Sequence, residues 1–183
     1  MVARVYLEGS LPEDLAARVA DALVIGPQRT ATQDIEYAID QLAEVAMRAL
    51  SPGINDPFTA INCVDRMGHA LAALARRPLP SAERRDDDGT IRLVVVPYTY
   101  RDIVKAAFGQ LRETTRTHVA VSLRLLDVIR RVAEFSPPVS LRKALAEEAR
   151  VVFESAAAAA GHEADRDRLA ARHAEVARAL ETG

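Results

Sequence analysis

The chain of 183 residues is poor in cysteine, aromatic residues and lysine. It has one cysteine and no tryptophan, and aromatic residues make up 4% of it. A single cysteine excludes an intramolecular disulfide and a multi-cysteine metal site, so we expect Cys63 to be a small core residue. Lysine provides two of the 24 basic residues, which face 26 acidic ones for a net charge of −2. That balance excludes a generally basic nucleic-acid-binding protein, and we expect no nucleic-acid partner.

Long apolar runs are also missing. A helix that crosses a bilayer needs about 20 consecutive apolar residues, and no stretch of this sequence approaches that length. Arg4 and Glu8 interrupt the start, and no apolar region follows them, so the sequence predicts no signal peptide. With 49% hydrophobic and 27% charged residues, the composition is that of a soluble globular protein.

Apolar residues recur mostly at helical spacing. One stripe runs through Ile35, Ile39, Leu42, Ala46 and Leu50, and similar stripes predict further helices over about 12–24, 57–77, 103–111, 121–135 and 141–160. We therefore predict a mainly α fold, a bundle of about six to seven helices. Residues 1–160 are expected to form a single helical domain, followed by a weakly packed helical tail over 161–183.

Two short segments have strand character instead. Residues 91–96 are apolar and β-branched, and a lone strand is not stable. We expect this strand to pair with residues 2–7 or with a strand of another chain. Residues 78–90 lack apolar periodicity and are predicted to be an exposed, mobile loop.

Helix ends are marked by polar residues. Thr30 and Gln33 have the spacing of a capping box, with Thr32 as a competing cap. Asn55 or Asp56 is expected to cap the helix that starts with Pro57.

The densest polar pattern lies between residues 29 and 66. It includes the run from Arg48 to Ala60, RALSPGINDPFTA, which joins two apolar-striped helices. Buried polar groups must be paired, so we expect these side chains to form either a rigid structural network or a binding site. Backbone N–H groups at the helix start would attract an anion, whereas three aspartates, Asp34, Asp56 and Asp65, would gather a hard cation. The candidate residues are Arg29, Asp34, Arg48, Ser51, Asn55, Asp56, Thr59 and Asp65.

This pattern resembles the signature of a family of bacterial membrane proteins named domain of unknown function 2254. The resemblance rests on Arg29-Thr30, Gln33-Asp34, the run from Arg48 to Ala60, and Asp65-Arg66. It implies N-terminal transmembrane helices followed by a soluble portion, and this chain is similar to the soluble portion alone. The implied context is the bacterial inner membrane, with this chain on the cytoplasmic side. The resemblance implies no catalytic residues.

Other chemistry has little support in the sequence. There is no two-histidine helix motif, no Gly-x-Ser-x-Gly and no glycine-rich phosphate loop. We expect no cofactor and no resident metal.

Three functional hypotheses follow. The leading one is a non-enzymatic cytoplasmic or regulatory domain that assembles with copies of itself and serves a membrane protein. Its motivation is the weakly packed tail, the strand that needs a partner and the charge asymmetry. Residues 1–60 carry four basic and nine acidic side chains, while residues 101–150 carry ten basic and six acidic ones. The partners would be other copies and the membrane part of a longer protein, or a membrane partner. The alternatives are a ligand- or ion-sensing module at the Ser51–Thr59 loop and a hydrolase with Asp34 or Asp56 as general base.

Overall fold

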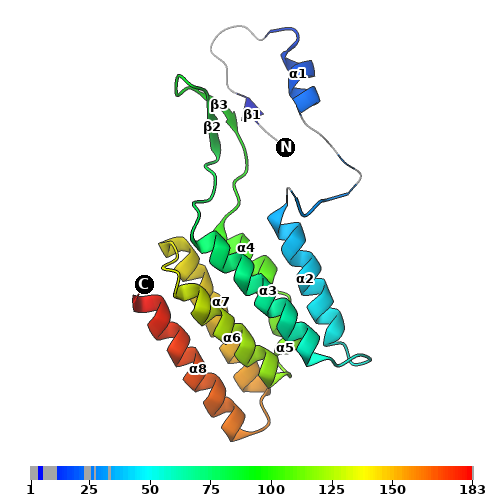
Figure 1. The fold of residues 1–183 in the computed structure, drawn as a ribbon, viewed down its shortest axis with the longest axis vertical. Helices are drawn as coiled ribbons and strands as arrows, with labels where there is room; N and C mark the ends of the chain where they lie inside the picture. Colours follow the sequence, from blue (N-terminus) through cyan, green and yellow to red (C-terminus); the bar gives the residue numbers. More distant parts are fainter. Residues whose placement is uncertain (1–3, 6–11, 23–25, 27, 33, 183) are drawn as a thin grey trace. The chain divides into compact units, whose positions relative to one another are not determined.

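A computed structural model of the chain describes residues 4–5, 12–22, 26, 28–32 and 34–182 (Figure 1). The chain divides into two compact units, Met1–Arg29 with Leu79–Tyr98 and Thr30–Pro78 with Thr99–Gly183. We had expected a single helical domain over residues 1–160. The described residues hold eight helices and three short strands, which confirms the mainly α class. The elements are β1 (Arg4–Val5), α1 (Leu15–Ala22), α2 (Ile35–Ala49), α3 (Pro57–Ala75), β2 (Glu83–Arg85), β3 (Ile91–Val94), α4 (Tyr100–Phe108), α5 (Leu111–Thr115), α6 (Val119–Ala133), α7 (Val139–Ala159) and α8 (Glu163–Thr182).

The first unit contains α1 and a small antiparallel sheet in which β3 lies between β1 and β2. Arg4 pairs with Val94 and Val5 pairs with Leu93, so the predicted pairing of these two segments is confirmed. The other residues of the predicted strand 2–7 lie outside the described residues. Helix α1 falls within the predicted range 12–24, and its predicted last residues, 23 and 24, are likewise outside the described residues.

Strand β2 corrects the prediction of a loop over 78–90. It pairs with β3 in a hairpin whose turn is organised by Asp86. The Asp86 carboxylate accepts the N–H groups of Asp88 at 3.1 Å and Thr90 at 2.9 Å, and Arg92 Nε donates to it at 2.6 Å. Gly89 adopts φ +80°, which glycine tolerates without strain. All three side chains of β2 are exposed, so this strand has no apolar alternation that a sequence pattern could reveal.

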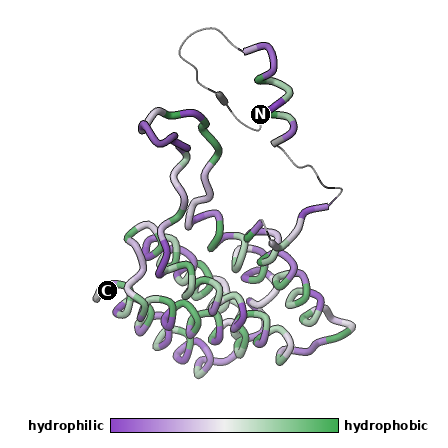
Figure 2. Tube along the Cα trace, turned by 45° about the horizontal axis from the view of Figure 1, so that its top comes forward, coloured by the Kyte–Doolittle hydropathy of each residue, from purple (hydrophilic) through white to green (hydrophobic). Residues whose placement is uncertain are grey.

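The second unit is a helical bundle. Helices α2 and α3 pack on each other, α3 packs on α6, and α4 packs on α2 and α7. Figure 2 shows hydrophobic and hydrophilic residues alternating along these helices, which is typical of helices with one buried face. The cap of α2 differs from the predicted capping box, because Asp34 Oδ1 accepts the Tyr37 N–H at 3.0 Å.

The predicted helix over 103–111 is in fact two helices, α4 and α5. Gly109 is the C-cap of α4, and its N–H donates to the carbonyl of Lys105 at 2.8 Å. Glycine propagates a helix poorly, and the buried Leu111 belongs to α5.

Small side chains let α3 and α6 approach closely. A Cβ added to Gly68 would lie 2.4 Å from Val128 Cγ1, far inside van der Waals contact. Cys63 is buried in the same bundle, as predicted, and burial raises the pKa of its thiol. The largest fully buried side chains are Phe108, Ile39, Met67, Leu71, Ile103, Leu111, Leu125, Leu126, Ile129, Leu141, Leu145 and Leu169.

Helix α8 packs along α6 and α7 (Figure 1). Leu169 and Val176 are buried, and the ring of His173 stacks on Phe153 with centroids 4.7 Å apart. Arg172 forms an ion pair with Asp127 of α6. This is closer packing than the weakly packed tail that we expected over 161–183. Large apolar residues are few in this segment, but those at 169, 176 and 180 share one helix face.

Candidate functional site

The turn between α2 and α3 is organised by Asp56. Its carboxylate accepts the N–H groups of Phe58 and Thr59, both at 3.1 Å, and the Thr59 hydroxyl at 2.6 Å. The Asp56 N–H donates to the Ala49 carbonyl at 2.7 Å. The Thr59 hydroxyl first, and then the Thr59 and Phe58 N–H groups, lower the pKa of Asp56 below its usual value. Asp56 therefore acts as the ionised cap of α3, one of the two caps, Asn55 or Asp56, that the sequence predicted.

Backbone hydrogen bonds hold the rest of this turn. The Ser51 carbonyl accepts the N–H groups of Ile54 at 3.0 Å and Asn55 at 2.9 Å. Asn55 has φ 48°, in the left-handed region where asparagine is enriched. Ile54 and Phe58 are nevertheless 57% and 77% exposed, so the turn presents two large apolar side chains to solvent.

Two other predicted site residues lie at the two ends of α2. Asp34 caps the start of α2, and Arg48, near the end of the same helix, pairs with Glu44 at 2.5 Å. Fourteen residues of helix separate Asp34 from Arg48 by roughly 21 Å, so one small ligand does not reach both. Arg29 belongs to the first compact unit. The side chains of Asp56 and Thr59, two of the predicted residues, are in direct contact.

Asp65 forms a contact that no local pattern indicated. Arg124 of α6 donates to it from Nε and from an Nη atom, each at 2.6 Å, and both side chains are partly buried. Hydrogen bonding to Asp65 raises the pKa of Arg124. The pair connects α3 to α6 across 59 positions of sequence.

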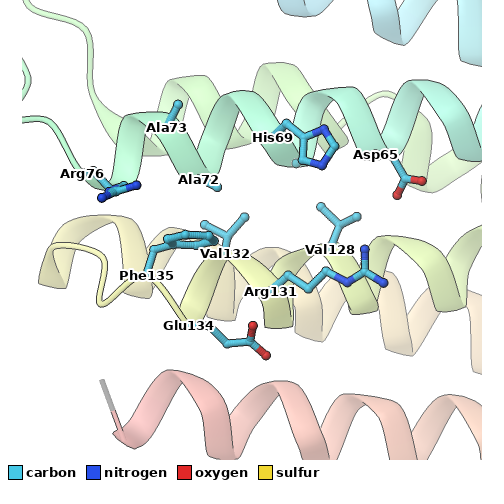
Figure 3. A pocket seen from close by; sticks show the side chains of 11 residues that line it. Asp65, His69, Ala72, Ala73, Arg76, Val128, Arg131, Val132, Glu134 and Phe135 are labelled. Carbon is cyan, nitrogen blue, oxygen red and sulfur yellow. The ribbon is translucent and has the colours of Figure 1, made fainter.

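A groove of about 440 Å³ runs between α3 and α6, beside this ion pair. Figure 3 shows Val128, Val132 and Phe135 pointing from the α6 side toward α3. Phe135 is 45% exposed. The small residues that form the α3 wall are Gly68, Ala72 and Ala73, and the charged or titratable residues that line the groove are Asp65, His69, Arg76, Arg131 and Glu134.

The groove was not predicted, because its walls come from two helices that are distant in sequence. The spacing of Gly68 and Ala72 by four residues was the available signal, since it predicts a strip of small side chains on one helix face. Among the described residues, no three His, Cys, Asp or Glu side chains lie close enough together to hold a metal ion.

Comparison with known proteins places these features in a family. The family model described as "Predicted membrane protein (DUF2254)" matches residues 1–131. The chain is 33% identical over 172 residues to the uncharacterized protein Rv1290c of Mycobacterium tuberculosis strain H37Rv and to the uncharacterized protein Mb1321c of Mycobacterium bovis. Each match covers 92% of this chain and 33% of the relative, so the chain spans about a third of the length of these relatives. No solved structure matches the chain.

The family match overturns one expectation. We had expected a soluble chain on the cytoplasmic side, but the family is described as one of membrane proteins, and nothing supports the cytoplasmic side. Among the described residues, none of the helices combines the length and apolar character that crossing a bilayer requires.

Proposed function

Because the chain belongs to the family of predicted membrane proteins called DUF2254, we propose that it is a non-enzymatic, self-assembling regulatory domain of a membrane protein. The chain spans about a third of the length of its mycobacterial relatives. That share leaves room in such a protein for a membrane-embedded part, with which this domain would act.

The observation that carries the assembly proposal is the groove between α3 and α6. Its floor is apolar, and the partly exposed Phe135 lies at one end. Open apolar grooves with charged rims mark protein interaction sites. Association would bury Phe135 and the alanines of α3 in an interface core of small and aliphatic side chains, which would stabilise the assembly.

The charges of the rim favour a second copy as the occupant. Arg76 and Arg131 are basic, while Asp65 and Glu134 are acidic. In a two-fold symmetric dimer the same patch meets itself, so a charged patch is complementary to itself only when it carries both signs of charge. The groove meets that requirement, and we propose that it is the dimer interface.

The experiment compares the oligomeric state of the whole chain with that of the A73R variant, by native mass spectrometry and light scattering. Ala73 lines the groove and is exposed, so arginine there blocks the groove without entering the core. The matched control is A164R, at an exposed alanine of α8. We expect the wild type and A164R to form dimers and A73R to be a monomer with unchanged helical circular dichroism. A wild-type monomer at every concentration, or an A73R dimer, would overturn the proposal.

A further inference from the structure

A second cavity, of about 360 Å³, lies between α4, α5 and α7. It differs from the α3–α6 groove in being strongly charged. Its wall carries six charged side chains, Arg101, Asp102, Lys105, Arg112, Glu147 and Glu148. All of them belong to the helical bundle, and none of them belongs to the polar pattern over residues 29–66.

Glu148 is the unusual member of this set. It is 6% exposed, and its Oε1 atom is buried without a hydrogen-bond partner. Its other oxygen, Oε2, lies 3.6 Å from an Nη atom of Arg112, which is longer than a hydrogen bond. An unpartnered carboxylate oxygen in the interior is costly, so this environment favours the protonated form of Glu148.

Two of the cations in the wall are available to a ligand. Lys105 is exposed, and among the described residues its ammonium group forms no ion pair or hydrogen bond. Arg112 has only the long pairing with Glu148. Arg101, in contrast, donates to both carboxylate oxygens of Glu147 at 2.8 Å, which neutralises that pair.

We propose that this cavity binds a small oxyanion, a carboxylate or a phosphate, between Lys105 and Arg112, with protonated Glu148 donating a hydrogen bond to it from Oε2, the oxygen that faces Arg112. Lysine and arginine are suited to such anions, as a point charge and as a planar fork of donors. A neutral carboxylic acid adds a third donor and removes the repulsion that an ionised Glu148 would exert. Where Glu148 is ionised in the free protein, binding takes up one proton.

The surroundings of Glu148 support its protonation. Burial is the largest influence and raises the pKa of Glu148, Arg112 lowers it, and Glu147 raises it. The other charged groups of the cavity are Arg101, Asp102 and Lys105 on α4. A bound anion would raise the pKa of Glu148 further, so affinity should increase as the pH falls through the range in which this group titrates.

The test is titration calorimetry of the whole chain with sodium sulfate, whose charge is constant over the pH range in which Glu148 titrates. We expect binding that strengthens from neutral to acidic pH and takes up protons, measured in two buffers of different ionisation enthalpy. K105A should weaken binding about tenfold, and R112A by at least as much, because each removes a charge-assisted hydrogen bond. E148Q should keep an affinity within about threefold of the wild type at acidic pH and lose the proton uptake.

The matched control is K143A, at the other lysine of the chain, which is exposed and lies outside this cavity. It should bind sulfate like the wild type. Phosphate and acetate, titrated in the same way, identify whether tetrahedral or planar oxyanions fit better. Absence of sulfate binding by the wild type, equal weakening by K105A and K143A, or loss of binding in E148Q would overturn the proposal. The proposal does not rest on dimer formation, since none of these outcomes depends on the α3–α6 groove.

Discussion

Two acidic side chains of the bundle, Asp56 in the α2–α3 turn and Glu148 on α7, differ in burial and in hydrogen bonding. Asp56 accepts three hydrogen bonds from residues two and three positions away, and these lower its pKa. Glu148 is buried, has one oxygen without a partner, and has a raised pKa. Asp56, in the conspicuous polar run, therefore finds its hydrogen-bond donors within that run. Glu148, which belongs to no sequence motif, has a buried oxygen that lacks a hydrogen-bond partner. A dense polar sequence is an uncertain guide to a binding site when its groups are close enough in sequence to pair with one another.

The largest expected effect on the free energy of unfolding comes from a substitution that disturbs the close packing of α3 on α6. G68A should destabilise the protein by about 1–3 kcal/mol, because its new Cβ would overlap Val128 of α6. G53A, in the α2–α3 turn, has no atom within 4 Å of the added Cβ and should change stability little. Urea denaturation of the two variants measures the difference, and equal stabilities would show that α3 and α6 separate at little cost.

A somewhat smaller difference in stability is expected between a variant that loses a long-range ion pair and one that loses a local ion pair. R124A should cost about 1–2 kcal/mol, because it removes two charge-assisted hydrogen bonds to a partly buried carboxylate. R48A removes an exposed pair four residues apart and should cost about 0.5 kcal/mol or less. The same denaturation measurement applies, and a cost for R48A as large as that for R124A would contradict the distinction.

Loss of the α3 cap should have a moderate effect. D56A removes the acceptor for three donors at a helix start and should lower Tm by about 2–4 °C at neutral pH. Since the pKa of Asp56 is lowered in the folded state, its contribution is present above its ordinary pKa of about 3.9 and is lost as the pH falls through the folded value. Thermal melts of wild type and D56A should therefore converge in acid. Melts that stay equally far apart at every pH would mean that the charge of Asp56 is irrelevant.

The smallest expected effect concerns Glu148, whose contribution to stability changes with pH in the direction opposite to that of Asp56. The pKa of Glu148 is raised, so its protonated form stabilises the fold below its ordinary pKa of about 4.3, and this contribution is lost as the pH rises through the folded value. The wild type should thus become less stable relative to E148Q as the pH rises through that window. Chemical denaturation of both proteins without added oxyanion measures the difference, and pH profiles that run parallel would show that Glu148 is not held protonated by burial.

Local signals predicted much of the fold. The apolar stripe from Ile35 to Leu50 located α2, and Asp56 with Pro57 marked the start of α3, because helix spacing and capping act over one or two turns. The same reasoning missed β2, whose exposed residues carry no alternation, and the packing of α8, whose three large apolar residues only acquire partners in the folded bundle.

The candidate site was predicted less well. The residues from Arg29 to Asp65 were grouped because they are close in sequence, but helix α2 holds Asp34 and Arg48 at its two ends. Asp65 pairs with Arg124, which lies outside that group of residues. The sequence did not predict a role for Glu148, because a single glutamate on an amphipathic helix has no sequence signature.

By itself, the sequence determined the helical class, the positions of most helices, a cap at Asn55 or Asp56 and the resemblance to a membrane-protein family, because each depends on residues within a few turns of one another. Only the tertiary structure decided that Gly68 meets Val128, that Asp65 pairs with Arg124, and that Glu148 is buried beside Lys105 and Arg112. These contacts join residues 36 to 60 positions apart or remove a carboxyl group from water, and burial of that kind is set by how whole helices pack.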